Sequence, residues 1–363
     1  FSTKALAKYA YYVTRYVNND ETQIHVDNTY RQQEMYFSTS NVYEILSKWS
    51  VSMSYDFKWN KLNANMVDFA FPHRYSNFVS LATALTLSRI QAQASLVEQV
   101  VKDHVKYGAS SSSRSTLTPA FFVNVYPFES KLLAVRAFAK KSFRMPTFND
   151  LYYADMGNSK LNPESALQYD LGFVLNKDWK QGIVDHFRLQ VDGYYNTVYD
   201  KIVAYPKGQQ FRWTMLNLGK VHIKGVDAMA EVGLEPAKDW KVTARLQYTY
   251  QDARDVTDPN TSYYKDQIPY IPWHSGSAIL GLSWRELDLA YSFIYSGERY
   301  SQQENILYNH LQPWYTHDMS VAYHARKWSA RLDVNNIFSQ DYDVILNYPM
   351  PKRNYMLTLE YNF

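Results

Sequence analysis

Hydrophobic and polar residues alternate with a period of two along most of this chain. In residues 49–60, WSVSMSYDFKWN, every odd-numbered residue is apolar or aromatic and every even-numbered residue is polar. The same alternation runs through residues 241–251, KVTARLQYTYQ, and through the last ten residues, NYMLTLEYNF. Successive side chains of a β-strand point to opposite faces, so each segment predicts a strand with one apolar and one polar face.

Followed along the whole chain, this alternation predicts sixteen strands and no helix of three or more turns. Many of them are about ten residues or longer, whereas strands of soluble proteins average about five to six residues. The predicted strands are 4–17, 29–39, 48–59, 78–87, 90–104, 117–126, 131–143, 164–175, 186–202, 219–233, 240–251, 275–284, 286–296, 314–324, 327–337 and 354–363.

The connections between these strands alternate between short and long. Outer-membrane barrels have short periplasmic turns and long extracellular loops, with a lipid-facing apolar band between aromatic girdles. The pattern therefore favours an all-β, antiparallel transmembrane β-barrel over a soluble β-sandwich, and the last strand is expected to end in the periplasm. The short connections are 88–90, 127–130, 235–239, 285–286 and 325–326; the long ones include 60–77, 144–163, 252–274, 297–313 and 338–353.

Composition narrows the class of protein further. The 363 residues include 33 Tyr and no Cys, and the net charge of +3 is too small to indicate nucleic-acid binding. No apolar run approaches the length of a membrane helix, about 20 residues. There is no recognisable hydrolase, metalloprotease or phosphate-binding motif, so the chain is not expected to be an enzyme. Because it opens without Met or a signal peptide, we expect a mature fragment or truncated product.

Several loop segments resemble those of a known family, the TonB-dependent outer-membrane receptors. The shared features are an FRxPTxxDLY segment followed by GNxxLxPE, an NxG…GVD strand, a penultimate-strand NxxFxxxY motif and a closing YPMP segment. Here they lie at 140–153 with 157–165, at 217–232, at 334–344 and at 347–363. The set looks most like Bacteroidetes-type receptors for cobalamin or iron chelates. In one departure, Lys352 stands where the family commonly has Gly, so this loop is expected to differ.

The resemblance implies a 22-stranded barrel occluded by an N-terminal plug. On this hypothesis residues 1–363 are the C-terminal portion of the barrel domain, with about 16 of 22 strands present and the plug and first strands missing. A complete sixteen-stranded, porin-sized barrel is the alternative.

The same resemblance implies TonB-dependent active transport of a scarce, bulky solute across the bacterial outer membrane. Cobalamin is favoured as the solute, with a ferric siderophore or haem next. Haem receptors of this family place a His between the two motifs, and no His lies between Phe143 and Pro163 here, so haem is less favoured. Implied partners are outer-membrane lipids, the TonB–ExbB–ExbD complex through the missing N-terminal part, a small-molecule chelate and, as a further candidate, a surface lipoprotein. No cofactor is implied. The alternative function is a passive channel or a structural, adhesive surface barrel.

Ligand contacts are expected from aromatic and arginine residues of the long loops, because Arg grips anions and Tyr offers apolar area with a polar tip. Neither His310 with His317 nor the acidic residues of 252–266 are expected to bind a metal; the acidic segment is interpreted as a solvated loop rather than a calcium site. The candidate ligand-binding residues are Arg144, Tyr152, Tyr153, Arg212, Trp213, Tyr263, Tyr264, Arg299 and Tyr348.

Overall fold

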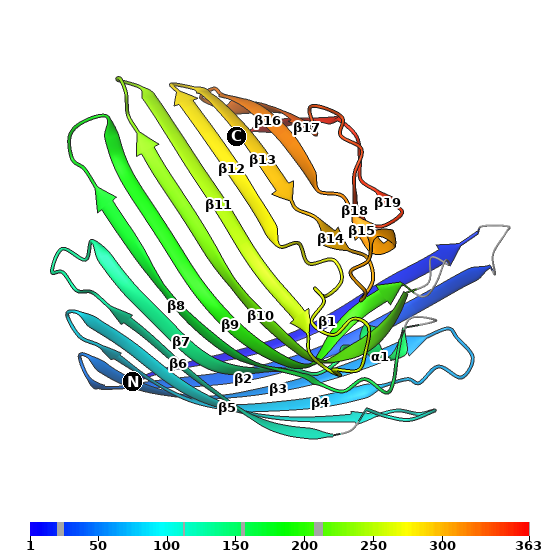
Figure 1. Ribbon diagram of the computed structural model, residues 1–363. Helices are drawn as coiled ribbons and strands as arrows, with labels where there is room; N and C mark the ends of the chain where they lie inside the picture. Colours follow the sequence, from blue (N-terminus) through cyan, green and yellow to red (C-terminus); the bar gives the residue numbers. More distant parts are fainter. Residues whose placement is uncertain (20–24, 112, 154–156, 207–212, 363) are drawn as a thin grey trace. The chain divides into compact units, whose positions relative to one another are not determined.

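The chain folds almost entirely into antiparallel β-strands in a computed structural model that describes residues 1–19, 25–111, 113–153, 157–206 and 213–362 (Figure 1). Sixteen strands form one sheet in sequence order, from β1 to β20, and neighbours in that order are hydrogen-bonded. They are β1 (Ser2–Asn18), β2 (Val26–Leu46), β3 (Trp49–Ala64), β4 (His73–Thr86), β5 (Ile90–His104), β6 (Arg114–Val125), β7 (Leu133–Arg144), β8 (Glu164–Asp178), β9 (Val184–Pro206), β10 (Trp213–Leu234), β11 (Trp240–Asp255), β12 (His274–Trp284), β13 (Leu287–Ser296), β16 (Trp314–His324), β17 (Trp328–Asn335) and β20 (Asn354–Tyr361).

The sixteen predicted strands correspond one to one with the strands of this sheet, so the all-β, antiparallel prediction is confirmed. Several strands extend beyond the predicted ends: β2, β9 and β10 have 21, 23 and 22 residues. A strand needs only about 9–11 residues to cross a bilayer. In β2, backbone pairing with the neighbouring strands continues through the added residues at both ends. The predicted connection 60–77 accordingly shortens to residues 65–72.

The first compact unit comprises residues 1–123, 138–168 and 197–220. Its strands β1 and β2 pair without interruption from Ser2 opposite Val42 to Asn18 opposite Val26. Continuous registers also join β3 to β4 and β4 to β5, whereas β2 and β3 pair with one irregularity near residue 45. Because the side chains alternate, Tyr12, Gln32 and Leu62 lie on one face of this sheet and Tyr11 and Gln33 on the other.

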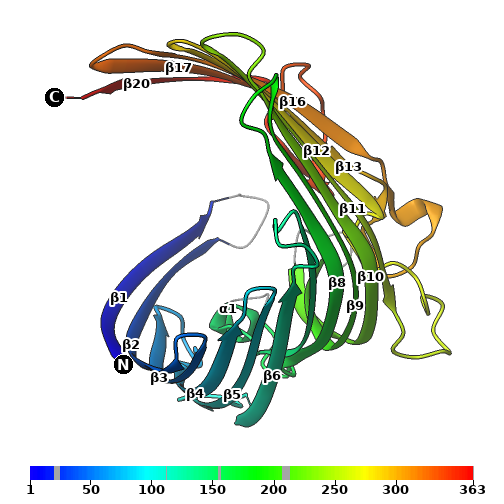
Figure 2. The ribbon, with the colours of Figure 1, turned by 90° about the vertical axis from the view of Figure 1, so that its left-hand side faces the viewer.

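A hydrophobic core covers one end of that face. It forms where the short helix α1 (Phe148–Tyr152) packs against the ends of the strands, as seen beside β3 and β4 in Figure 2. The helix begins at Thr147, whose hydroxyl accepts the Asp150 N–H, while the Asp150 carboxylate accepts the Thr147 N–H at 2.8 Å. This capping box satisfies two backbone donors at the start of the helix. The buried core residues are Tyr30, Leu62, Ala64, Phe69, Phe148, Leu151, Tyr152, Leu161 and Ile202.

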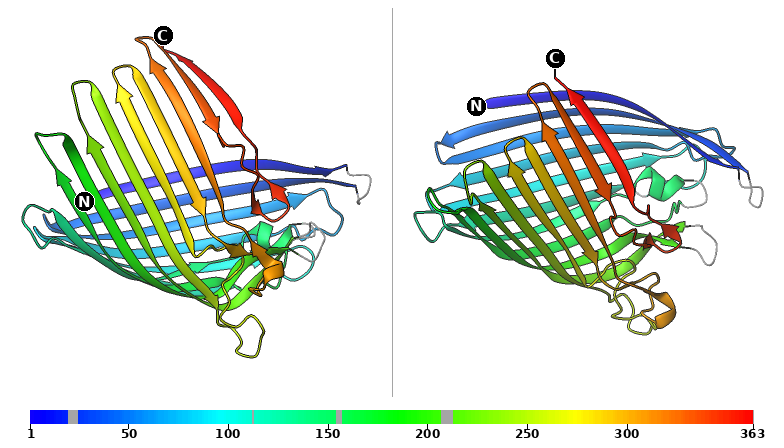
Figure 3. Two further views of the ribbon diagram at one scale, coloured as in Figure 1. Left: turned by 45° about the horizontal axis from the view of Figure 1, so that its top comes forward. Right: turned by 90° about the horizontal axis from the view of Figure 1, so that it is seen from above.

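The second compact unit comprises residues 124–137, 169–196 and 221–363, and its strands β11, β12, β13, β16, β17 and β20 lie side by side (Figure 3). Two long connections contain small hairpins, β14 (Arg299–Tyr300) with β15 (His310–Leu311) and β18 (Asp343–Ile345) with β19 (Tyr348–Pro349). A 3-10 turn, η1 (Leu307–Asn309), precedes β15. The two predicted loops 297–313 and 338–353 therefore contain short strands. The terminal residue Phe363, part of the predicted closing strand, lies outside the described residues.

Side-chain exposure follows the predicted alternation. Leu246 and Met53 are each 57% exposed, whereas Asn60 and Leu62, on the opposite face from Met53, are 7% and 2% exposed. Tyr248 is also exposed, and Val51 and Tyr55 are half-buried. Within the described part of the chain, no helix has both the length and the apolar character to span a membrane.

Candidate functional site

An arginine on β4 fixes the loop that carries α1 to the first unit. The Arg74 guanidinium donates two hydrogen bonds to the Asp103 carboxylate, both at 2.7 Å, and a third to the Pro146 carbonyl at 2.7 Å. It also lies 5.1 Å from the centroid of the Phe148 ring. The Asp103 side chain is fully buried and that of Arg74 is 11% exposed. Charge-assisted bonds of this kind are strong and directional, so the loop is held in a defined position.

The neighbouring charged side chains are also paired. The Glu34 carboxylate lies 2.7 Å from the Lys58 ammonium and 3.4 Å from that of Lys8, and it accepts a hydrogen bond from the Asn60 amide at 3.1 Å. Lys8 and Lys58 therefore share one carboxylate partner.

Two cavities lie between α1 and the strands of the first unit, and Gln32 and Asn149 line both. The larger, which we call the tyrosine cavity, has a volume of about 390 Å³. The smaller, about 320 Å³, is lined by Gln32, Lys58, Asn60, Arg74, Thr147, Phe148 and Asn149. The tyrosine cavity is lined by Tyr12, Thr14, Tyr30, Gln32, Leu62, Asn149, Asp150, Tyr153 and Met215.

Three of the predicted ligand-binding residues lie together around α1. The Tyr153 ring stacks on the Tyr30 ring, with centroids 4.7 Å apart and planes 19° apart, and lines the tyrosine cavity. Tyr152 is buried instead: its hydroxyl accepts the Ser111 N–H at 3.4 Å, and burial raises the pKa of its phenol. Arg144 is partly exposed, 3.7 Å from the Asp150 carboxylate and 3.9 Å from that of Glu164.

Several strand residues line the tyrosine cavity, and three of them, Tyr12, Tyr30 and Gln32, are not among the residues predicted from the sequence. That prediction placed the ligand contacts in the loops. The strand alternation carries a usable signal, because these three residues share the face that is mainly polar.

The remaining predicted residues belong to the second unit, except for Arg212, which lies outside the described residues, and Trp213, which begins β10 in the first unit. Tyr263 and Tyr264 are half-buried in the connection after β11, with the Lys265 ammonium 5.2 Å from the Tyr264 ring centroid. Tyr348 lies in β19 with 45% of its surface exposed.

Arg299, another predicted ligand contact in this unit, is only 3% exposed. Its guanidinium donates hydrogen bonds to the carbonyls of Gln312, Asp343 and Val344 at 3.1, 2.6 and 3.2 Å. Burial lowers the pKa of the guanidinium below its usual value. These contacts tie the segment after β13 to β18, so in this structure the side chain joins two loops.

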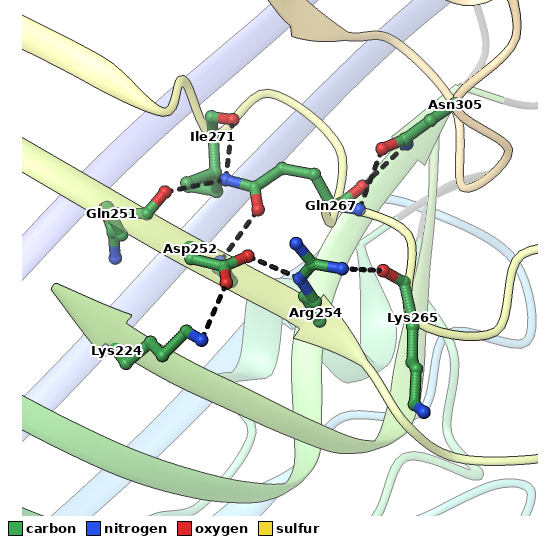
Figure 4. Close-up of polar contacts among 9 residues, drawn as sticks. Lys224, Gln251, Asp252, Arg254, Lys265, Gln267, Ile271 and Asn305 are labelled. Carbon is green, nitrogen blue, oxygen red and sulfur yellow. Dashed lines mark hydrogen bonds and ion pairs between the residues drawn. The ribbon is translucent and has the colours of Figure 1, made fainter.

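A second polar cluster, which we call the Gln267 knot, fixes the connection after β11 (Figure 4). The Gln267 side chain accepts the Ala253 N–H at 2.8 Å and donates to the carbonyls of Gln251 and Ile271 at 3.1 and 3.2 Å. Asn305 pairs with the Gln267 backbone through bonds of 2.8 and 3.0 Å. Gln267 is fully buried, so the hydrogen bonds of its side chain are shielded from bulk water.

The acidic residues of this connection hold protein groups. Asp252 contacts Arg254 at 2.6 Å and Lys224 at 3.3 Å (Figure 4), while Asp255 and Asp258 accept backbone N–H groups two residues further on. Among the described residues, no group of three or more His, Cys, Asp or Glu side chains is arranged to hold a metal ion.

Comparison with known proteins identifies the fold. The family model described as "TonB dependent receptor-like, beta-barrel" matches residues 1–337. The structure is similar to that of the FrpB iron transporter from Neisseria meningitidis, with a TM-score of 0.76 and 13% identity over 99% of this chain and 61% of that one. It is also similar to the copper transporter OprC, with a TM-score of 0.73 and 15% identity over 99% and 62% of the two chains. For the ferric citrate transporter FecA the TM-score is 0.72, with 13% identity over 98% and 58%.

The chain thus spans about 61% of the length of the FrpB structure. The matched family consists of outer-membrane barrels that act as transporters, which agrees with the predictions of a barrel fold, an outer-membrane location and no enzymatic activity. By its match over residues 1–337, the chain belongs to the TonB-dependent receptor-like β-barrel family.

Proposed function

We propose that the protein imports a scarce, bulky, metal-containing solute across the outer membrane by TonB-coupled transport. The observation that carries this proposal is the segment 145–153, whose motif residues form part of the wall of a defined cavity. Thr147 and Asp150 form the capping box, Asp150 and Tyr153 line the tyrosine cavity, and Arg74 holds the loop at Pro146. A rigid, concave surface with few polar groups is what a solute-binding site requires.

Cobalamin is the favoured cargo, and a ferric siderophore or haem is the next candidate. The general resemblance of the motifs favours cobalamin. The similar structures favour metal-containing cargo more broadly, since they include iron, copper and ferric citrate transporters.

In this proposal residues 1–363 form the C-terminal part of a larger barrel, and a plug and earlier strands lie upstream. The long connections face the outside and the short turns face the periplasm. Outer-membrane lipids surround the barrel, the TonB–ExbB–ExbD complex acts through the upstream part, and a surface lipoprotein is a further candidate partner.

The test is uptake by intact cells at limiting solute concentration. Cells producing the natural protein should accumulate radiolabelled cyanocobalamin or a labelled ferric chelate saturably, and cells lacking it should not. Accumulation should stop when a protonophore removes the proton gradient or when TonB is deleted. Uptake that rises linearly with concentration and survives both treatments would instead identify a passive channel.

A further inference from the structure

We infer that the tyrosine cavity is a binding subsite for an uncharged, amide-bearing ring portion of the cargo. This inference rests on the proposed function and adds to it the ligand chemistry and the residues that recognise it. Four features of the cavity support it: its aromatic wall, its unpaired amides, the absence of a free cation among its described lining residues and its size.

The aromatic wall is built from two segments of the chain. Tyr12 and Tyr30 come from the paired strands β1 and β2, and Tyr153 comes from the end of the α1 loop. Tyr30 is 4% exposed and is fixed by its stacking on Tyr153 and by its hydroxyl, which donates to the Met66 sulfur at 3.5 Å. The wall is therefore ordered without a ligand. Preformed tyrosine surfaces bind flat or apolar ring faces at little entropic cost.

The polar groups of the cavity are short of partners. Thr14, Gln32 and Asn149 line it, and within the described part of the chain their side chains make no hydrogen bond. Gln32 and Asn149 carry carboxamides, each of which offers an acceptor oxygen and two donor hydrogens. Another carboxamide uses both functions at once, whereas a carboxylate can use only the donors. The two side chains thus match a ligand that presents amides.

Charge argues in the same direction. Among the described residues, no Lys or Arg lines the tyrosine cavity, and its one carboxylic acid is Asp150. The nearby cations are paired: Lys8 with Glu34, and Arg144 with Asp150 and Glu164. A multiply anionic chelate would meet no Lys or Arg side chain among the described lining residues, so the cavity offers it no direct ion pair. An uncharged group requires no ion pair.

The cavity volume sets the scale of what can enter. About 390 Å³ lies near the lower end of ordinary ligand pockets, which range from about 300 to 1,000 Å³. It accommodates one edge of a bulky solute, and the remainder must be held elsewhere. A corrinoid, with a broad ring and peripheral carboxamides, has the required chemistry, so cyanocobalamin is the appropriate probe.

The register of β1 and β2 provides matched controls. Tyr12 lies opposite Gln32 on the cavity face, and Tyr11 lies opposite Gln33 on the other face. Tyr12→Ala and Gln32→Leu therefore have matched control variants, Tyr11→Ala and Gln33→Leu. The controls change the same residue types on the same strands. Tyr153→Ala tests the contribution of the loop.

Equilibrium binding of radiolabelled cyanocobalamin is measured on de-energised cells that produce the natural protein or each variant, normalised to the amount of folded barrel at the surface. We expect each cavity variant to weaken binding about tenfold, equivalent to about 1.4 kcal/mol, and each control to change it less than about twofold. Ferric citrate should compete poorly for the labelled probe.

Three results would overturn the inference: no binding of cyanocobalamin to the natural protein, equal effects of the cavity and control variants, or tighter binding of ferric citrate. The proposed function fails on a different measurement. If binding depends on the cavity residues but uptake is independent of the proton gradient, the subsite stands and the transport proposal falls.

Discussion

Replacing Arg74 by Met should destabilise the α1 loop and the strands beneath it. The change removes two charge-assisted hydrogen bonds to Asp103, whose side chain is fully buried, and the bond to the Pro146 carbonyl. Removing one partner of a buried ion pair costs about 3–5 kcal/mol, because the remaining charge stays buried and unpaired. We therefore expect the free energy of unfolding to fall by about that amount.

The double variant Arg74→Met/Asp103→Leu separates the unpaired charge from the lost packing. With both charges gone, no carboxylate is left uncompensated, and most of the lost stability should return. Urea unfolding of the natural protein and its variants in lipid vesicles, followed by tryptophan fluorescence, gives the free energies. Limited proteolysis within residues 145–153 reports the α1 segment directly.

A fall in the free energy of unfolding of less than about 1 kcal/mol in the single variant would contradict this reasoning. The Arg74–Asp103 pair would then contribute no more than an exposed salt bridge. The reasoning would also fail if the double variant were as unstable as the single one.

Three further predictions test the orientation, the faces and the Gln267 knot. An impermeant thiol reagent on intact cells should label a cysteine placed in residues 256–273 but should not label the Ala237→Cys variant. Labelling of Ala237→Cys would mean that the proposed orientation is wrong. Leu246→Arg should reduce the folded yield through a cost of about 2–4 kcal/mol at the lipid face, whereas Gln247→Arg should not; equal damage would refute the face assignment. Gln267→Met leaves one N–H and two carbonyls without partners and should lower the free energy of unfolding by about 1–3 kcal/mol. Amide hydrogen exchange in residues 256–273 should become faster, and unchanged exchange would contradict this expectation.

The strand pattern was predictable because one physical signal determines it. Each strand has an apolar and a polar face, and period-two alternation records this directly in the sequence. Strand ends were less predictable: β2 was expected to end at residue 39 but continues to Leu46. Backbone pairing with a neighbour, rather than the apolar pattern, decides how far a strand extends.

The loops and the site were predicted less completely because their contacts join residues far apart in the chain. The T-x-x-D spacing of Thr147 and Asp150 is a local signal for α1. No local signal indicates that Arg299 bonds to carbonyls near residue 343, or that Tyr153 stacks on Tyr30. Residue type suggested the chemistry of these side chains, and only the fold shows which partners they have.

The Gln267 knot also bears on how the connection after β11 can change over time. The turn at 257–260 is exposed, while the knot lies several residues further along and is buried. Lengthening a loop between fixed ends costs little, about 0.6 kcal/mol for each doubling of its length. In the proposed orientation this turn faces the outside, so insertions there would alter what antibodies or phages encounter without moving the strands below. In that orientation the turn is a site at which the protein can diversify its exterior and one at which an epitope tag can be inserted.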